Sequence, residues 1–187
     1  MAKGSSRGAD YMRGFTWGMK GEEVVMANLN KELEGIKSRS MKGLIMAAAF
    51  IRDKTEKTPP LTPVDYGNLR DSYFVVTATS TPVGAGKHAF KGPNAAQMAS
   101  EHGSVLSESQ GMVASQSTAT KKFLIMGYSA NYSGFVHEMI YANFNPEKRK
   151  GKAIRREGAG PKWLETHIKN ITKKLVQIVK DNAQIKK

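Results

Sequence analysis

A long helical stripe that ends at prolines is the feature that most constrains this 187-residue sequence. Between residues 21 and 58, apolar or small side chains return every three or four positions, at Val25, Leu29, Leu33, Ile36, Ser40, Leu44, Ala47 and Ile51. Gly35 and Gly43 weaken the middle of this stripe and allow a kink or a break into two helices. Pro59, Pro60 and Pro63 then end it, because proline lacks the amide proton that a helix needs. The sequence therefore predicts a long N-terminal helix.

Two strands and a second helix are predicted after this helix. SYFVVTATS at 72–80 alternates as a strand does, with Tyr73, Val75 and Thr77 on one side and Phe74, Val76 and Ala78 on the other. KKFLIMGYS at 121–129 is the second strand. Residues 161–187 carry another helical stripe, at Leu164, Ile168, Ile171, Leu175, Ile178 and Ile185. This order predicts an α+β domain over residues 21–187, with both helices packed on a small antiparallel sheet.

Three segments are predicted to be irregular. Residues 1–20 set aromatic side chains among glycines, which suits an arm that becomes ordered against a partner or folds back on its own domain. Residues 80–120 are rich in Gly, Ser, Ala, Thr and Gln and are predicted to form a long loop or loose hairpin. Residues 145–160 form a basic linker that would contact DNA phosphates, dock on an acidic protein surface or stay solvated, through Lys148, Arg149, Lys150, Lys152, Arg155 and Arg156.

Charge and composition limit the partners and the compartment. The formal net charge is +13, and residues 141–187 contribute 13 basic and 4 acidic side chains to it. Such an excess is typical of proteins that meet nucleic acid or another anionic surface. The chain has no cysteine, which excludes disulfides and thiolate chemistry. Its longest apolar run, GLIMAAAFI at 43–51, is too short to cross a bilayer, so we expect a soluble cytoplasmic chain.

No catalytic, cofactor-binding or metal-binding constellation is predicted. GAGKH at 84–88 lacks the first glycine of a phosphate-binding loop, which would fall at Thr81, and His88 stands where Ser or Thr is required. His137 and Glu138 are adjacent, but Tyr141 occupies the place of a zinc protease's second histidine, so their predicted role is structural. The four histidines show no ligand spacing. We therefore predict that the protein is not an enzyme and uses no cofactor.

Three short stretches, in a fixed order, resemble a family of bacteriophage proteins. The first is TPVDYGNLRDSY at 62–73, between the long helix and the first strand, with Pro63, Gly67, Leu69, Arg70 and Ser72. The second is YSGFVHE at 132–138, with Tyr132, His137 and Glu138, and the third is GPKWLE at 160–165, with Trp163 and Leu164. Together they resemble the tail-component family of long-tailed bacteriophages over roughly residues 21–182. Ser133 replaces that family's usual alanine, and Trp163 replaces its phenylalanine.

The first stretch also has a physical interpretation. Pro63 would fix the exit from the helix, and Gly67 is able to take a positive φ. Asn68 or Asp65 would cap a short turn from which Leu69 packs inward. Arg70 would then stand at the start of the strand, where we expect it to pair with Glu138 and to organise the sheet end or a subunit contact.

The resemblance implies a structural role in a virus particle, in head–tail joining and tail completion. It implies a homo-oligomeric ring of six or twelve copies at the neck, between the head connector and the tail tube or terminator, with genomic DNA in the lumen. The protein would be in the host cytoplasm during assembly and in the virion afterwards. Two alternatives stay open: a basic nucleic-acid-associated protein, and another station in the particle, such as a tail terminator or minor capsid protein.

Overall fold

A computed structural model describes residues 22–64, 66–85, 89–118, 121–142, 144 and 156–184. The chain divides into two units, Met1–Gly35 and Ile36–Lys187. The first helix, α1 (Glu22–Lys57), belongs to both units and is continuous as a helix across Gly35 and Gly43. The predicted arm at residues 1–20 and most of the predicted basic linker lie outside the described residues.

The larger unit is built around a two-stranded antiparallel sheet. β1 (Tyr73–Val76) pairs with β2 (Ile125–Tyr128), with Tyr73 opposite Tyr128 and Val76 opposite Ile125. Beyond β1 the chain turns at Thr77 and Ser80 and returns, so that the Val75 N–H donates to the Val83 carbonyl. These elements confirm the α+β class, with both predicted strands in an antiparallel sheet.

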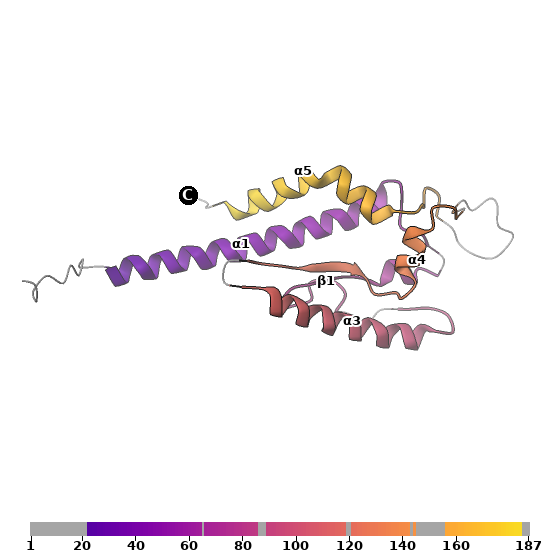
Figure 1. The fold of residues 1–187 in the computed structure, drawn as a ribbon, viewed down its shortest axis with the longest axis horizontal. Helices are drawn as coiled ribbons and strands as arrows, with labels where there is room; N and C mark the ends of the chain where they lie inside the picture. Colours follow the sequence, from indigo (N-terminus) through magenta and orange to yellow (C-terminus); the bar gives the residue numbers. More distant parts are fainter. Residues whose placement is uncertain are drawn as a thin grey trace, which may run out of the picture. The chain divides into compact units, whose positions relative to one another are not determined.

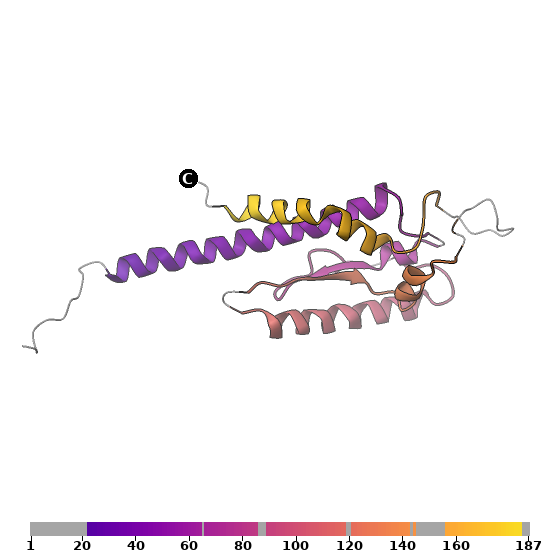
Figure 2. The same ribbon diagram turned by 45° about the horizontal axis from the view of Figure 1, so that its top comes forward.

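Helices cover both faces of this sheet (Figures 1 and 2). Tyr73 and Val75 point toward α1, where they pack against the buried Ala48. Phe74 and Val76 point to the opposite face and pack against Val113 of the helix α3. The two sides of β1 therefore carry the residues that period-two alternation predicted for them.

α3 (Ala95–Gln116) corrects the prediction of a long loop at residues 80–120. Its core-facing row consists of His102, Ser109 and Val113, which are buried, and Val105 and Leu106, which are half-buried. A helical spacing is present, but histidine and serine occupy positions where a stripe search expects leucine or isoleucine. Gly103 and Gly111 lie on the exposed side and further reduce the apparent helix propensity.

The C-terminal helix α5 (Trp163–Ala183) lies beside the part of α1 within the larger unit (Figures 1 and 2). The two helices approach closely at Gly43, where an added Cβ would be 3.0 Å from the Val179 Cα. Gly43 thus permits contact between the two helix backbones. The buried side of α5 is formed by Trp163 and His167, whereas Ile168 of the predicted stripe is exposed.

Two short helices complete the unit. α2 (Asn68–Asp71) follows Gly67 and leads into β1, and α4 (Ser133–Glu138) follows β2. The segment that follows α1 is joined to the segment that precedes α5 by a bridge between Leu61 and Ala159, where the Leu61 N–H donates to the Gly158 carbonyl at 2.8 Å. The ends of α1, α4 and α5 are thereby brought to the same end of the sheet (Figure 2).

Candidate functional site

The three sequence stretches that carry the family resemblance meet in one place. Leu69 from the first stretch and Trp163 from the third are buried in a cluster with Ala130. Val136, from the second stretch, and Leu164 pack against this cluster. We call this group the motif junction. Sequence order alone could not have placed together residues that lie more than 90 positions apart.

Trp163 is the centre of the motif junction. Its side chain is only 1% exposed, and the rings of Tyr128 and His137 meet it edge-on, with centroids 6.1 Å and 4.7 Å away. Edge-on contacts of this kind set the positive rim of one ring against the negative face of another. The Trp163 indole N–H is buried and has no hydrogen-bond partner among the described residues. Packing therefore holds this side chain in place without a hydrogen bond from its N–H.

The first stretch forms the turn that the sequence predicted, but none of its described side chains caps α2. Gly67 has φ 91°, a left-handed conformation that glycine adopts without strain, and its carbonyl accepts from the Asp71 N–H. Asn68 does not cap α2: its side-chain amide pairs with both backbone groups of Lys91, at 2.8 Å each. Asp65 lies outside the described residues. Asn68 thus ties the turn to a distant segment.

Ser72 connects this turn to β2. Its hydroxyl donates to the Leu69 carbonyl at 2.8 Å, and its own carbonyl accepts from the Ser129 N–H at 2.9 Å. Pro63, the other residue singled out in this stretch, lies six residues beyond the end of α1 and is half-buried.

The second and third stretches are joined by backbone and ionic contacts. The Lys162 N–H donates to the His137 carbonyl at 2.8 Å, and the Lys162 ammonium contacts the Glu138 carboxylate. The Glu165 N–H donates to His137 Nε2 at 3.4 Å, which leaves His137 Nδ1 to donate to Glu138 at 2.8 Å. Through these contacts His137 and Glu138 link the end of α4 to the start of α5.

The charges at this junction stabilise one another. The Lys162 ammonium, and secondly the His137 ring, lower the pKa of Glu138 below its ordinary value. Glu138 in turn raises the pKa of Lys162. Both side chains are open to solvent, which screens their charges and keeps their contribution to stability small.

The predicted Arg70–Glu138 pair is wrong. Arg70 forms its ion pair with Glu56 of α1, at 3.9 Å, whereas Glu138 is engaged by Lys162 and His137. The reason is topological: α2 follows directly on the end of α1, so Arg70 lies beside the last turns of that helix, while α4 presents Glu138 to the start of α5.

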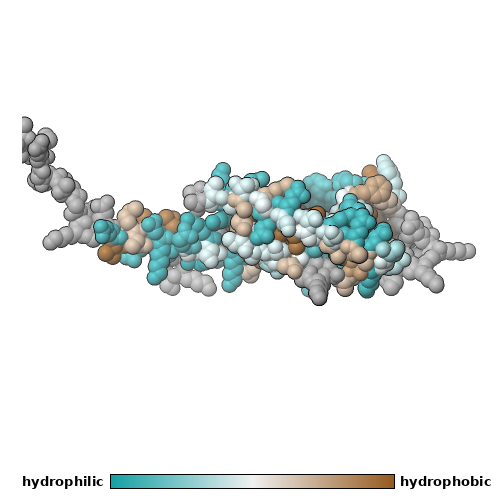
Figure 3. Space-filling model, turned by 90° about the horizontal axis from the view of Figure 1, so that it is seen from below, coloured by the Kyte–Doolittle hydropathy of each residue, from teal (hydrophilic) through white to brown (hydrophobic). Residues whose placement is uncertain are grey.

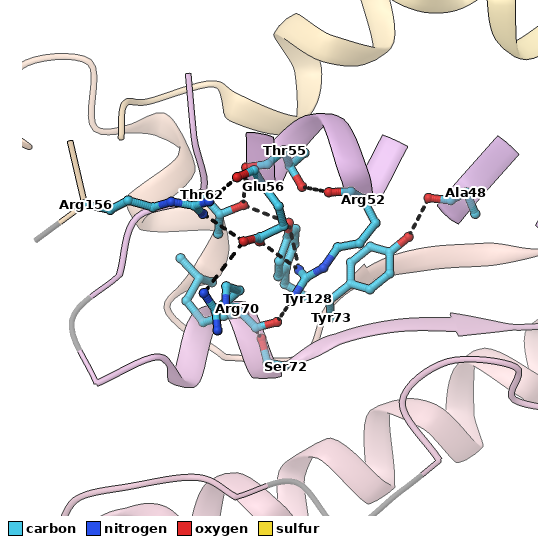
Figure 4. A network of polar contacts seen from close by, with 11 residues as sticks. Ala48, Arg52, Thr55, Glu56, Thr62, Arg70, Ser72, Tyr73, Tyr128 and Arg156 are labelled. Carbon is cyan, nitrogen blue, oxygen red and sulfur yellow. Dashed lines mark hydrogen bonds and ion pairs between the residues drawn. The ribbon is translucent and has the colours of Figure 1, made fainter. Parts of the chain in front are cut away.

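Glu56 is the centre of a second polar group, which sequence analysis missed (Figure 4). Three guanidinium groups point to its carboxylate, from Arg156 at 2.8 Å, Arg52 at 3.6 Å and Arg70 at 3.9 Å. Arg156 also donates to the Glu56 carbonyl. The i,i+4 pair of Arg52 and Glu56 was visible in the sequence, but the partner 100 positions away was not.

Two tyrosines line this arginine–glutamate cluster. The Arg52 guanidinium lies 4.6 Å from the centre of the Tyr73 ring, an attractive cation–π geometry. The Tyr73 hydroxyl donates to the Ala48 carbonyl at 3.0 Å, and burial raises its pKa strongly. Tyr128 shares a hydrogen bond of 3.2 Å with Thr62. The cluster therefore joins the end of α1 to both strands and to the segment at Arg156.

Of the predicted basic contact residues, only Arg156 is described, and it is occupied by Glu56. Lys148, Arg149, Lys150, Lys152 and Arg155 lie outside the described residues. Tyr132 immediately precedes α4, where its carbonyl accepts from the Val136 N–H, and it is 37% exposed. It is one of several apolar side chains exposed around α4, the others being Phe135 at 70%, Ile140 at 55% and Tyr141 at 95%.

Sequence analysis also missed a buried Ser–His pair, which has the atoms of a catalytic dyad but is closed off from solvent. His102 Nδ1 lies 2.5 Å from the Ser129 hydroxyl, and Nε2 lies 2.8 Å from the Gly84 carbonyl. Because a carbonyl only accepts, Nε2 carries the proton and Nδ1 accepts from Ser129. Both side chains are buried, so this pair holds α3 to the sheet end rather than facing a substrate.

Comparison with known protein families, curated proteins and solved structures finds no match to this chain. Over the residues that the structure describes, no group of histidine, aspartate and glutamate side chains has the arrangement of a metal site. In the same ranges, none of the helices combines the length and hydrophobicity needed to cross a membrane.

Proposed function

We propose that this chain is a structural protein of a tailed bacteriophage, which forms or joins a ring at the neck, where the head meets the tail. The observation that carries the proposal is the convergence of the three resembling stretches at the motif junction. Residues that match a family by chance have no reason to touch. Here Leu69, Val136 and Trp163 pack together, as they would if the stretches mark the core of a shared fold.

The surface also supports a role in assembly. Exposed side chains around α4 and on the first half of α1 include Phe135, Tyr141, Val25 and Leu29. Exposed apolar patches on small proteins mark surfaces that other molecules cover. Partners in a virus particle would cover them, with each copy presenting two different faces to its neighbours in the ring.

Quantitative mass spectrometry of purified particles of the phage that encodes this chain tests the proposal. We expect the chain in the particle at six or twelve copies per portal ring, far below the tail-tube protein. Absence from the particle would refute the proposal. A copy number in the hundreds would place the chain in the capsid or the tail tube instead.

The charge of +13 favours one second candidate, a nucleic-acid-associated protein. Such a protein would bind duplex DNA with an affinity that falls steeply as salt increases, because bound counterions are released. A filter-binding titration at two salt concentrations separates the candidates. The assembly role predicts weak binding by the isolated chain, and tight, salt-sensitive binding would favour the second candidate.

A further inference from the structure

The first half of α1 presents an apolar row that is exposed among the described residues of its unit. Val25, Leu29 and Leu33 are spaced four residues apart on one face, and their exposed fractions are 65%, 52% and 44%. Val24 and Met26 widen the patch, which is visible as hydrophobic atoms along this part of the helix (Figure 3). The same segment is acidic: residues 22–35 include four glutamates and one lysine, a net charge of −3 in a chain of +13. We call this segment, with its apolar side chains, the acidic row.

The outer face of α5 has the complementary character. Ile168 and Val176 are 37% and 48% exposed, and with Thr172 they also repeat every four residues. Lys173 and Lys180, seven residues apart, run along one edge of this row, and both are exposed. α5 as a whole contains four lysines against one glutamate and one aspartate. We call this surface the basic row.

We infer that the acidic row of one copy binds the basic row of a second copy. Both rows follow the i,i+4 ridge of a helix over about 12 Å, the ridges that interdigitate in the commonest class of helix packing. The charges have opposite sign, so they favour this pairing and steer the two copies together. A second copy is the natural occupant because the same chain carries both halves of the match.

Charge argues against a symmetric pairing of two acidic rows, which would set −3 against −3. The proposed contact is heterologous, since the two copies use different surfaces. A heterologous contact leaves one row of each kind free at the ends, so it generates a ring or an open chain. The inference thus deepens the proposed ring by naming a contact within it, and it rests on that proposal only for its biological setting.

A mixing experiment on the full chain tests the contact. Leu29→Asp disables the acidic row, and Val176→Asp disables the basic row, while each variant keeps the other row intact. Sedimentation velocity and light scattering should show that the wild-type mass rises above the 20.5 kDa monomer with concentration. Each variant alone should associate at least about tenfold more weakly than the wild type. Mixed one to one, the variants should form a heterodimer that grows no further.

Charge reversal provides the second arm, with a matched control. Glu32→Lys and Lys173→Glu should each weaken association, and the two changes in one chain should restore it. Lys121→Glu makes the same charge change at an exposed lysine outside both rows and should leave association unaltered. Circular dichroism of each variant verifies that the helices are intact.

Several outcomes would overturn the inference. A wild-type chain that stays monomeric at its highest soluble concentration would do so, as would a Val176→Asp variant that associates like the wild type. If Phe135→Asp abolishes association and Val176→Asp does not, the exposed residues around α4 are the receptor. If only deletion of residues 2–20 abolishes association, that segment, and not the acidic row, makes the contact between copies. The copy-number measurement on particles is independent of all these results, so the ring proposal is tested separately.

Discussion

Gly43 provides the sharpest test of how α1 and α5 pack. An added Cβ at this position would lie 3.0 Å from the Val179 Cα, 3.1 Å from the Asn182 Cβ and 3.2 Å from the Val179 carbonyl oxygen, whereas ordinary contacts begin at 3.4 Å. Two of these three atoms belong to the backbone, so no side-chain rotation relieves the contact. Gly43→Ala must therefore move α5 by a few tenths of an ångström.

Two terms of opposite sign set the size of the effect. Alanine is better than glycine inside a helix by about 1 kcal/mol. Overpacking at a tight contact costs about 1–3 kcal/mol. Gly43→Ala should therefore be neutral or destabilising by up to about 2 kcal/mol. Gly103→Ala and Gly111→Ala make the same change inside α3, where an added Cβ meets nothing within 4 Å, so each should stabilise by about 1 kcal/mol.

Urea and thermal unfolding followed by circular dichroism would measure the difference. Relative to Gly103→Ala, Gly43→Ala should lower the free energy of unfolding by about 1–3 kcal/mol, and each kcal/mol corresponds to about 2–4 °C in melting temperature. Gly43→Leu should be worse than Gly43→Ala. If Gly43→Ala stabilises as much as the two α3 variants do, the helices do not approach each other at this glycine, and the packing argument fails.

Three further predictions concern the candidate site. Glu56→Gln leaves three guanidinium groups without a carboxylate and should reduce the free energy of unfolding by about 2–3 kcal/mol in urea titrations. As a control, Asp53→Asn removes an exposed ion pair of the same helix and should cost under about 1 kcal/mol. Trp163→Phe should change the free energy of unfolding by less than about 1 kcal/mol, because removing an unpaired buried N–H offsets the lost packing. Leu69→Ala, in the same cluster, should cost about 2–5 kcal/mol. A large loss for Trp163→Phe would mean that the indole N–H has a partner. The pKa of Glu138 is depressed in the folded state, so the stability that Glu138 contributes is present above its ordinary pKa of 4.5 and is lost as pH falls through the lower folded pKa. Glu138→Gln should therefore flatten the pH dependence of the free energy of unfolding in that acidic range. An unchanged slope would contradict the Lys162 contact.

The sequence was sufficient for those elements whose buried faces are apolar. The C-terminal half of the α1 stripe, with Ala47 and Ile51 buried, the alternation of β1 and the proline stop follow from backbone sterics and hydrophobic burial, and the structure has each of them. The N-terminal half of the stripe is helical but exposed. α3 was missed because His102 and Ser109 occupy its inner face, and their burial depends on partners such as Ser129 that only the folded chain supplies. Arg70 was assigned the wrong carboxylate for the same reason: many glutamates were available, and only topology selects Glu56.

The position of the resembling residues determines which properties the resemblance predicts. Leu69, Val136, Trp163 and the turn at Gly67 lie inside the motif junction, where they serve folding. A partner in a particle would instead touch exposed residues such as those of the acidic row, the basic row and α4. These residues do not belong to the three resembling stretches' buried core, so the resemblance says little about them. Two proteins could share the junction and differ in every contact surface. Substitutions in the junction should therefore reduce folding and assembly together, whereas Leu29→Asp and Val176→Asp should reduce assembly of a chain that still folds. That separation would assign the motif junction to folding and the two rows to assembly.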